Sequence, residues 1–174
     1  LAWFLERAIG RFGLPDPLDL RFAADRYGPY AHRLTKLLDN LDGSYLHCDK
    51  RISDADPMDV IWFDDARKAF VQAYLKSEGK AYAKALEFTT ALIDGFESPF
   101  GMELLATVDW LLAREGVPPT VPALREGLHR WRGGPNAAER KNRLFDDRAL
   151  GIALARLGTL AAQSPTTPPK VPPP

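Results

Sequence analysis

Residues able to act as nucleophiles or bases are few in this sequence. His47, Cys48 and Asp49 are consecutive, a combination that could provide a thiol and a neighbouring base. Neighbours on a strand point to opposite faces, however, so the imidazole of His47 cannot easily reach the thiol of Cys48. We therefore interpret Cys48 as a small buried thiol that packs as an apolar group.

Metal and phosphate sites also lack their usual spacing. His32, His47 and His129 have neither close helical spacing nor a cysteine cluster beside them, so no zinc motif is present. Gly133 and Gly134 lie between predicted helices and lack the lysine and hydroxyl pattern of a phosphate-binding loop, which indicates a turn. We expect no catalytic residue, no metal and no cofactor in this chain, and thus no enzyme.

A run of acidic and aromatic residues is a better candidate for binding. Between residues 53 and 66 the sequence has aspartates but no lysine or arginine, and Trp62 and Phe63 lie among them. Carboxylates beside aromatic rings could imitate the phosphates and bases of a nucleic-acid strand. A solvated loop with a core tryptophan explains the same residues. Because strand neighbours alternate, we expect one of the two rings in the core and the other available.

The stretch RYGPYAHRLTKLLDNLDG, residues 26–43, predicts a stiff bend followed by a helix. Gly28 and Pro29 form the bend, and proline suits a helix start because its missing N–H would be unpaired there. Tyr27 and Tyr30 then either face a partner or pack around the bend. The complete set of candidate partner-binding residues is Tyr27, Tyr30, Asp54, Asp56, Asp59, Trp62, Phe63, Asp64 and Asp65.

The elements that must position these residues are predicted from hydrophobic periodicity. A helix over residues 1–12, a strand at 20–25, a helix closed by Gly43 and a hairpin of residues 44–48 and 59–63 follow one another. That order is winged-helix-like. The connection at residues 49–58 is polar and rich in aspartate.

From Asp65 onwards the pattern predicts helices only. Ser98 is a candidate N-cap with Pro99 at the first helical position, and a broad apolar stripe follows. Further helices are predicted at residues 121–131 and, opened by a capping box of Asn136 and Glu139, through residue 160. The fold class is thus mostly α with a small β hairpin (α+β): a winged-helix-like N-terminal half followed by a helical bundle. We expect one domain over residues 1–162 and a Pro-rich extended tail over 163–174.

The helices around REGVPPT leave a second alternative open. They could form a helix-turn-helix that presents basic residues to DNA, and an ordinary αα hairpin explains them as well. The basic residues concerned are Arg125, His129, Arg130 and Arg132.

Composition limits the possible partners and the compartment. The chain has 174 residues, 45% of them hydrophobic, and 23 basic residues balance 23 acidic ones. Because the charges balance, we do not expect the chain to bind nucleic acid directly. No apolar run approaches the length of a membrane span, and the single cysteine suits a reducing cytoplasm. Because the sequence begins inside a helical pattern, we interpret it as a segment of a longer protein.

Two longer motifs carry a family resemblance. RYGPYAHRLTKLLDNLDGSYL and GFESPFGMELLATVDWLL, followed by Trp131, Arg140, Lys141 and Phe145, resemble the C-terminal domain of DarG-type antitoxins. The resemblance covers nearly all of the chain except the Pro-rich tail. In that family the C-terminal domain binds the partner toxin DarT, an NAD-dependent DNA ADP-ribosyltransferase, and a separate macrodomain removes ADP-ribose from DNA.

The resemblance implies a bacterial, cytoplasmic antitoxin domain. It would bind a DarT-like toxin and occlude the toxin's single-stranded-DNA groove, with the acidic loop as a possible DNA mimic. The expected hydrolytic macrodomain has no counterpart in this chain, which implies no ADP-ribosyl hydrolase activity. The alternatives from other classes are a winged-helix DNA-binding module that regulates its own operon, and an enzyme.

Overall fold

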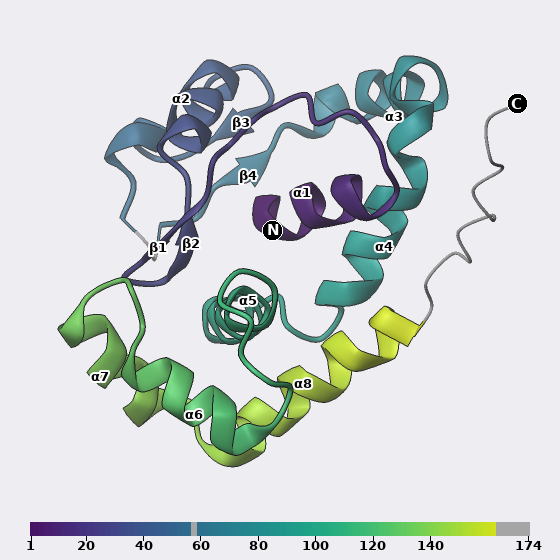
Figure 1. Cartoon of the computed structure of the whole chain (residues 1–174). Coiled ribbons are helices and arrows are strands. Elements are labelled where there is room, and N and C mark those ends of the chain that lie inside the picture. Colours follow the sequence, from purple (N-terminus) through teal and green to yellow (C-terminus); the bar gives the residue numbers. More distant parts are fainter. Residues whose placement is uncertain (57–58, 163–174) are drawn as a thin grey trace, which may run out of the picture.

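The computed structural model describes residues 1–56 and 59–162, and most of these residues are helical (Figure 1). The β structure consists of two short antiparallel strand pairs. The predicted fold class, mostly α with a small β part, is therefore confirmed. The finer likeness to a winged helix is not decided by this element content and stays a prediction.

Helix α5 (Pro99–Ala113) lies at the centre of the fold (Figure 1). The Ser98 hydroxyl accepts a hydrogen bond from the Gly101 N–H at 3.0 Å, and Pro99 occupies the first turn, as predicted. Leu105, Val108 and Leu111 are completely buried. Because α5 packs against β2, α6 and α8, it joins parts of the chain that are distant in sequence.

Helix α1 (Ala2–Arg11) contributes to the core on two sides. Trp3 and Phe4 join the cluster around α5, whereas Ala8 and Ile9 pack with Ala85 of α4 (Ala83–Ile93). The Trp3 indole N–H also donates to the Asp109 carboxylate of α5 at 2.8 Å. The predicted apolar spacing of the N-terminal helix therefore corresponds to real contacts.

The bend at Gly28 and Pro29 differs from the prediction. These residues do not begin a helix; they form strand β2 (Gly28–Tyr30), which pairs with β1 (Ala23–Asp25). Gly28 has φ 131°, a region that L residues with a side chain rarely adopt, and the chain reverses there into the second strand. Helix α2 (His32–Leu41) starts after Ala31, so the prediction of a rigid helix entry at Pro29 is wrong.

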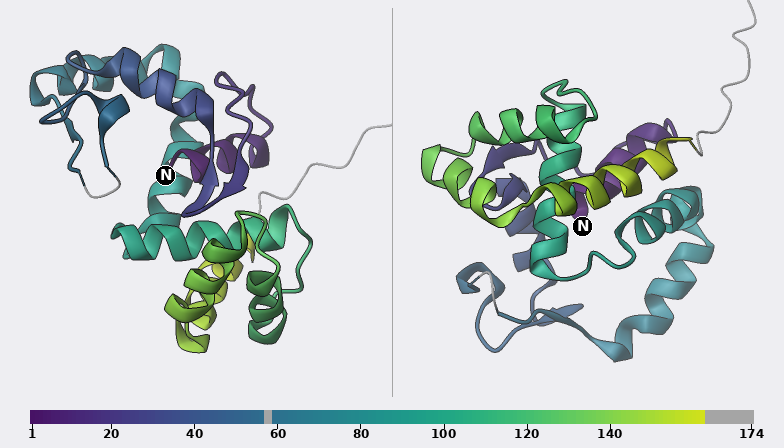
Figure 2. Two further views of the ribbon diagram at one scale, coloured as in Figure 1. Left: turned by 90° about the vertical axis from the view of Figure 1, so that its left-hand side faces the viewer. Right: turned by 90° about the horizontal axis from the view of Figure 1, so that it is seen from below.

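The second strand pair is the predicted hairpin. Strand β3 (Leu46–His47) pairs with β4 (Trp62–Phe63), and the 3-10 helix η1 (Ile52–Asp54) lies in the connection. After η2 (Asp65–Arg67), the chain continues through α3 (Lys68–Lys76) and η3 (Glu78–Tyr82) into α4. The hairpin, α2 and α3 lie at one end of the molecule, opposite the C-terminal helices (Figure 2).

The C-terminal part contains three helices, α6 (Val121–His129), α7 (Pro135–Leu144) and α8 (Asp147–Ala162). The prediction of one continuous last helix is wrong, because Phe145 leaves helical geometry and is fully buried. Asp146 then accepts from the Ala149 N–H at 2.7 Å and starts α8. The N-cap of α7 is Gly134, so the predicted capping box at Asn136 is also wrong. The predicted Pro-rich tail lies outside the described residues.

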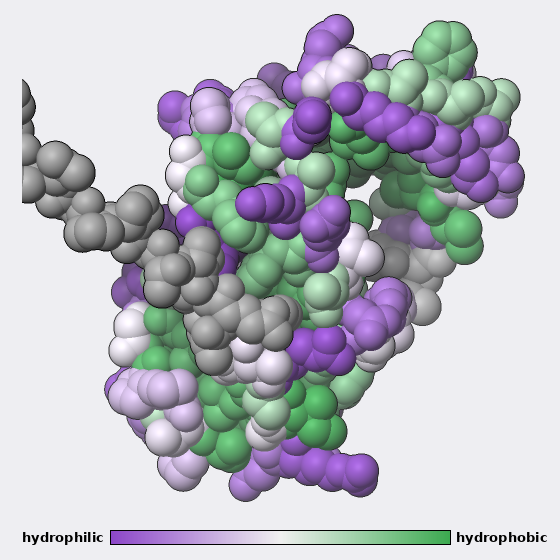
Figure 3. Space-filling model, turned by 90° about the vertical axis from the view of Figure 1, so that its right-hand side faces the viewer, coloured by the Kyte–Doolittle hydropathy of each residue, from purple (hydrophilic) through white to green (hydrophobic). Residues whose placement is uncertain are grey.

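Hydrophobic and hydrophilic residues alternate over the face that Figure 3 shows, and apolar groups reach the surface in several places. Phe70 and Tyr74 of α3 are 65% and 52% exposed.

Within residues 1–56 and 59–162, no helix is both long enough and apolar enough to cross a membrane.

Candidate functional site

The predicted acidic loop lies at the surface, but its carboxylates are largely paired within the chain. Asp56 and Asp59 both contact the Lys50 ammonium, at 3.0 and 2.8 Å. Hydrogen bonding to Lys50 holds the pKa of Asp59 below its usual range. The Asp56 N–H donates to the Asp59 carboxylate, so these aspartates form a local turn around one lysine. Asp54 is exposed at the end of η1.

The remaining two candidate aspartates also have partners. Asp65 contacts Lys68 at 2.8 Å, and Asp64 accepts from the Ala66 N–H and lies 3.7 Å from the Nε2 atom of His47. Lys50 and Lys68 flank the acidic run just outside residues 53–66. For this reason the run is less negative in three dimensions than in the sequence.

The four candidate aromatic residues are all partly exposed. Trp62 and Phe63 are 44% and 36% exposed, so the prediction that one of them is in the core is wrong. The hairpin is only two residue pairs long, so it has little surface of its own against which a ring could be buried. The Tyr30 hydroxyl lies 3.1 Å from the Thr35 hydroxyl. Partner binding by these residues stays a prediction.

Of the basic residues of the possible helix-turn-helix, His129, Arg130 and Arg132 are exposed, and the three arginines lie near carboxylates of the chain. The Arg125 guanidinium pairs with Asp147 and donates to the Asn142 carbonyl. Arg130 pairs with Glu126 within α6. Arg132 lies 3.8 Å from Glu115. Helix α6 packs against α7 and α8, as expected for an αα hairpin, and DNA binding by the exposed basic residues stays a prediction.

A cavity of about 620 Å³ lies beside α1 and is lined by residues of α1, α4, α5 and α8. Its polar groups bind one another: Asp109 accepts from Trp3 and from the guanidinium of Arg7. Burial raises the pKa of Glu6, with the nearby charge of Asp16 as a second cause. The Glu6 carboxylate lies 3.7 Å from Arg114. The arrangement joins α1 to α5 and brings together charges of both signs.

Tyr27 is the candidate residue with the most informative surroundings. The guanidinium of Arg26 lies over its ring at 5.2 Å from the centroid, and that of Arg140 at 5.0 Å. Tyr27 is 44% exposed, so the ring holds two cationic groups at the surface. The sequence predicted Tyr27 as a candidate and contained Arg140 only in the family motif; it could not place Arg140 beside Tyr27, because α7 lies more than a hundred residues away.

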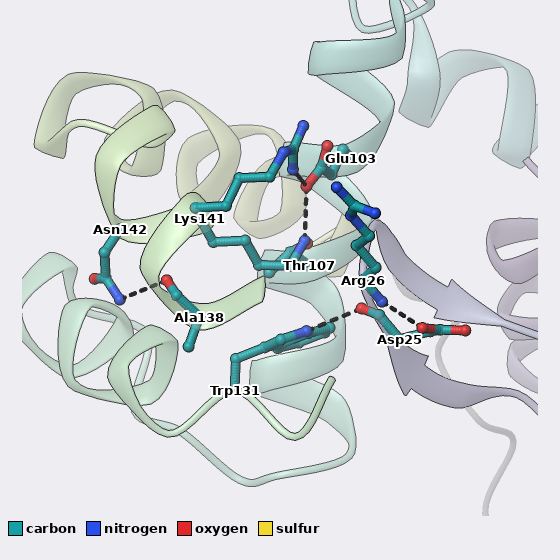
Figure 4. A network of polar contacts seen from close by, with 9 residues as sticks. Asp25, Arg26, Glu103, Thr107, Trp131, Ala138, Lys141 and Asn142 are labelled. Atoms are coloured by element: carbon teal, nitrogen blue, oxygen red, sulfur yellow. Dashed lines mark hydrogen bonds and ion pairs between the residues drawn. The ribbon is translucent and has the colours of Figure 1, made fainter. Parts of the chain in front are cut away.

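Behind this surface lies a buried charge network (Figure 4). The fully buried Lys141 ammonium contacts the Glu103 carboxylate at 2.8 Å and donates to the Thr107 hydroxyl at 3.1 Å. Arg140 also binds Glu103, so one carboxylate serves two cations. Burial lowers the pKa of Lys141, and Glu103 opposes that shift. The network ties α7 to α5.

Metal ligation has no candidate in the described residues. No three or more His, Cys, Asp or Glu side chains within residues 1–56 and 59–162 are arranged to hold an ion.

No family model matches the chain.

Curated proteins similar to this chain share one name. A Mycobacterium tuberculosis protein named DNA ADP-ribosyl glycohydrolase is 32% identical over 152 residues, which are 82% of this chain and 39% of that protein. A Mycobacterium bovis protein of the same name shows the same values. A Thermus aquaticus protein, again of this name, is 33% identical over 187 residues, covering 99% of this chain and 44% of that protein. The chain thus spans less than half the length of these relatives.

These names overturn the expected identity and function. The relatives are named for an enzyme, so the prediction of a DarG-type antitoxin domain that neutralises a toxin is corrected towards a DNA ADP-ribosyl glycohydrolase. The expectation of no enzyme is contradicted by the same names, and DNA mimicry by the acidic loop has no support in them. The expected toxin partner stays a prediction. The bacterial origin of the relatives agrees with the expectation.

Proposed function

We propose that this chain is part of a DNA ADP-ribosyl glycohydrolase and serves the removal of ADP-ribose from DNA. The observation that carries the proposal is the extent of the similarity. Relatives of this name match 82% to 99% of the chain at 32% to 33% identity. A short shared motif would not give a match of this length.

Hydrolysis of ADP-ribose from DNA requires a surface that binds anionic groups, and the surface around Tyr27 has suitable residues. Releasing ADP-ribose from DNA replaces the bond between a ribose carbon and the DNA with a bond to the oxygen of water. DNA and the diphosphate of ADP-ribose are both anionic, so the protein needs cationic groups at the substrate. Arginines held over an exposed aromatic ring, as at Tyr27, suit ligands that combine phosphates and bases.

The proposal concerns the longer protein and the contribution of this chain to it. Because the chain covers 39% to 44% of the relatives, the rest of such a protein has room for further substrate-binding and catalytic groups. The contribution of this chain to the reaction is therefore measured by deleting it from the longer protein and comparing the rates of ADP-ribose release.

The test uses the longer protein that contains this chain and a DNA oligonucleotide carrying ADP-ribose. We expect the longer protein to release free ADP-ribose, and we expect release to slow when the segment corresponding to residues 1–162 is deleted. Chromatography of the released ADP-ribose gives the rate. A longer protein that is folded and releases none would refute the proposed function.

A matched control separates loss of function from loss of folding. Deletion of residues 163–174 alone removes none of the described residues, and we expect it to leave the rate unchanged. Circular dichroism of the remaining part should show that it stays folded after the larger deletion. If the rate is the same with and without residues 1–162, this chain does not serve the reaction.

Two finer properties are also proposed. A winged-helix-like N-terminal half is supported by the order α1, β1–β2, α2, β3–β4, in which a helix precedes a hairpin. A cytoplasmic location is supported by Cys48, the free thiol among the described residues, which would remain reduced there.

A further inference from the structure

A basic cavity of about 450 Å³ lies where the β1–β2 turn meets the start of α7. Arg26 enters from the turn, and Arg140 and Arg143 enter from α7. The rest of the lining is the loop at Gly133 and Gly134 and the first residues of the helix. None of the described residues that line this cavity is acidic. It therefore concentrates positive charge in a chain whose formal net charge is zero.

The cavity is built by a specific contact between distant segments. The Trp131 indole N–H donates to the Asp25 carbonyl at 3.0 Å, next to Arg26 (Figure 4). Gly133 fits into this contact because it has no side chain: a Cβ there would lie 2.4 Å from the Trp131 nitrogen and 2.5 Å from the Asp25 oxygen. Gly134 follows with φ 102°, which favours glycine. Both glycines thus bring Arg26 close to the N-terminus of α7.

The groups around the cavity leave positive charge uncompensated. The first turn of α7 has no side-chain cap and no acidic residue, so the helix N-terminus is not neutralised. The side chain of Arg143 is exposed, and no ion pair joins it or the Arg26 guanidinium to a described carboxylate. Glu103 offsets one of the two cations it binds, Arg140 and Lys141.

Two of the arginines are also held in place. The guanidinium groups of Arg26 and Arg140 lie over Tyr27, which restricts their rotamers before any ligand arrives. A pre-ordered guanidinium loses less conformational entropy on binding than a free one. The nearest acidic neighbours in sequence are Asp25 and Glu139; the Asp25 carboxylate accepts from the Arg26 backbone N–H.

We infer that this cavity binds a phosphate group of a nucleic acid or nucleotide. Guanidinium groups pair with phosphate oxygens through two parallel hydrogen bonds, and uncapped helix N–H groups add further donors. The inference rests on this geometry and not on the proposed hydrolysis. It departs from the expectation, based on balanced charge, that direct binding of nucleic acid is not favoured.

The experiment titrates the chain with two probes that present phosphate differently. A fluorescein-labelled single-stranded oligodeoxynucleotide presents phosphodiesters, and ADP-ribose presents a diphosphate. Fluorescence anisotropy measures binding of the oligonucleotide. Amide chemical shifts in ¹⁵N-labelled protein report on both probes. We expect at least one probe to shift the amides of Gly133, Gly134 and Ala137, and the responding probe identifies the source of the phosphate.

Variants show whether the arginines are responsible. We expect Arg26→Gln and Arg143→Gln each to weaken binding about tenfold or more, because each removes a charge-assisted hydrogen bond to phosphate. Lys84→Gln is the matched control: it removes one exposed positive charge from α4, which does not line the cavity. It should leave the affinity unchanged. Both arginines are exposed, so circular dichroism should show folded variants.

Two outcomes would overturn the inference. In the first, neither probe shifts the amides of residues 133–137 at millimolar concentration. In the second, Lys84→Gln weakens binding as much as Arg143→Gln, which would mean attraction to charge in general. These measurements use the chain alone, whereas the hydrolysis assay uses the longer protein, so either proposal can fail without the other.

Discussion

Lys141 is the residue whose environment departs furthest from what its type suggests. Its side chain is fully buried, and Trp131 and Phe145 lie 4.9 and 5.5 Å from the ammonium. Such a charge is tolerated because Glu103 and Thr107 provide a counter-charge and an acceptor. The stability of the α5–α7 contact should therefore depend on Glu103.

We predict that Glu103→Gln lowers the free energy of unfolding by about 3–5 kcal/mol, because it leaves Lys141 charged and buried without its partner. Lys141→Met is the matched control. It keeps the volume and leaves Glu103 paired with Arg140, so its cost should be clearly smaller. Urea unfolding of both variants checks this. If both variants lose the same free energy of unfolding, the Glu103–Lys141 pair contributes through packing and not through its charges.

The same lysine predicts a pH dependence. Burial lowers the pKa of Lys141 from its ordinary 10.5, whereas the unfolded chain keeps the ordinary value. Between these two pKa values the unfolded state binds more protons, so this group makes the free energy of unfolding rise with pH. We expect wild type to gain stability relative to Lys141→Met as the pH rises from the lowered pKa of Lys141 towards the ordinary 10.5. Urea unfolding along that series measures the difference, and a constant difference would contradict the lowered pKa.

At the scale of elements, the loop before α7 depends on a glycine that has no room for a side chain. Gly133→Ala would place a methyl group against the Asp25 carbonyl and the Trp131 indole, which must then separate. We predict a loss of about 1–3 kcal/mol, typical of overpacking. Thermal unfolding gives the value. Binding at the basic cavity should weaken as well, because Arg26 moves away from α7.

Gly158→Ala serves as the control for that substitution. Gly158 is exposed in α8, and an added Cβ there meets nothing within 4 Å. Alanine should therefore stabilise the helix by about 0.4–1 kcal/mol. If the two glycine variants change stability equally, steric crowding at Gly133 is not the cause.

The start of α5 gives a second element-scale prediction. Ser98→Ala removes the acceptor for the Gly101 N–H and should cost about 1 kcal/mol. Ser53→Ala, at an exposed serine in η1, is the comparison and should be near neutral. Both are measured by thermal unfolding. A neutral Ser98→Ala would show that water replaces the cap without loss.

At the scale of the whole molecule, long-range hydrogen bonds join the two ends of the sequence. Trp3 to Asp109 and Trp131 to Asp25 each span 106 residues. Because α5 packs with elements from both halves, we propose that residues 1–162 unfold as one cooperative domain.

Unfolding with two probes tests this. Trp3, Trp110 and Trp131 are buried, so their fluorescence reports on the core, while far-ultraviolet circular dichroism reports on all helices. In a Trp62→Phe variant, which removes the exposed tryptophan, we expect both signals to give one coincident urea transition. Two separate transitions would show that the end containing α2 and α3 unfolds independently of the core.

Local patterns in the sequence were sufficient for several elements. The Ser98 cap, the apolar stripe of α5 and the hairpin of β3 with β4 could be predicted, because capping and periodicity act between residues a few positions apart. The reversal at Gly28 and the break at Phe145 could not. The reversal at Gly28 accompanies the packing of β2 against the distant helix α5, and the break at Phe145 accompanies the burial of its ring in the core.

The candidate sites divide in the same way. The cluster of acidic and aromatic residues at 53–66 and the turn at Gly133 and Gly134 could be read from local sequence. The pairing of Lys50 and Lys68 with the aspartates, and the position of Arg26 and Arg140 over the ring of Tyr27, follow from the folding of distant segments. Charge in a sequence is counted along the chain, but electrostatic attraction depends on distance in space, which packing alone sets.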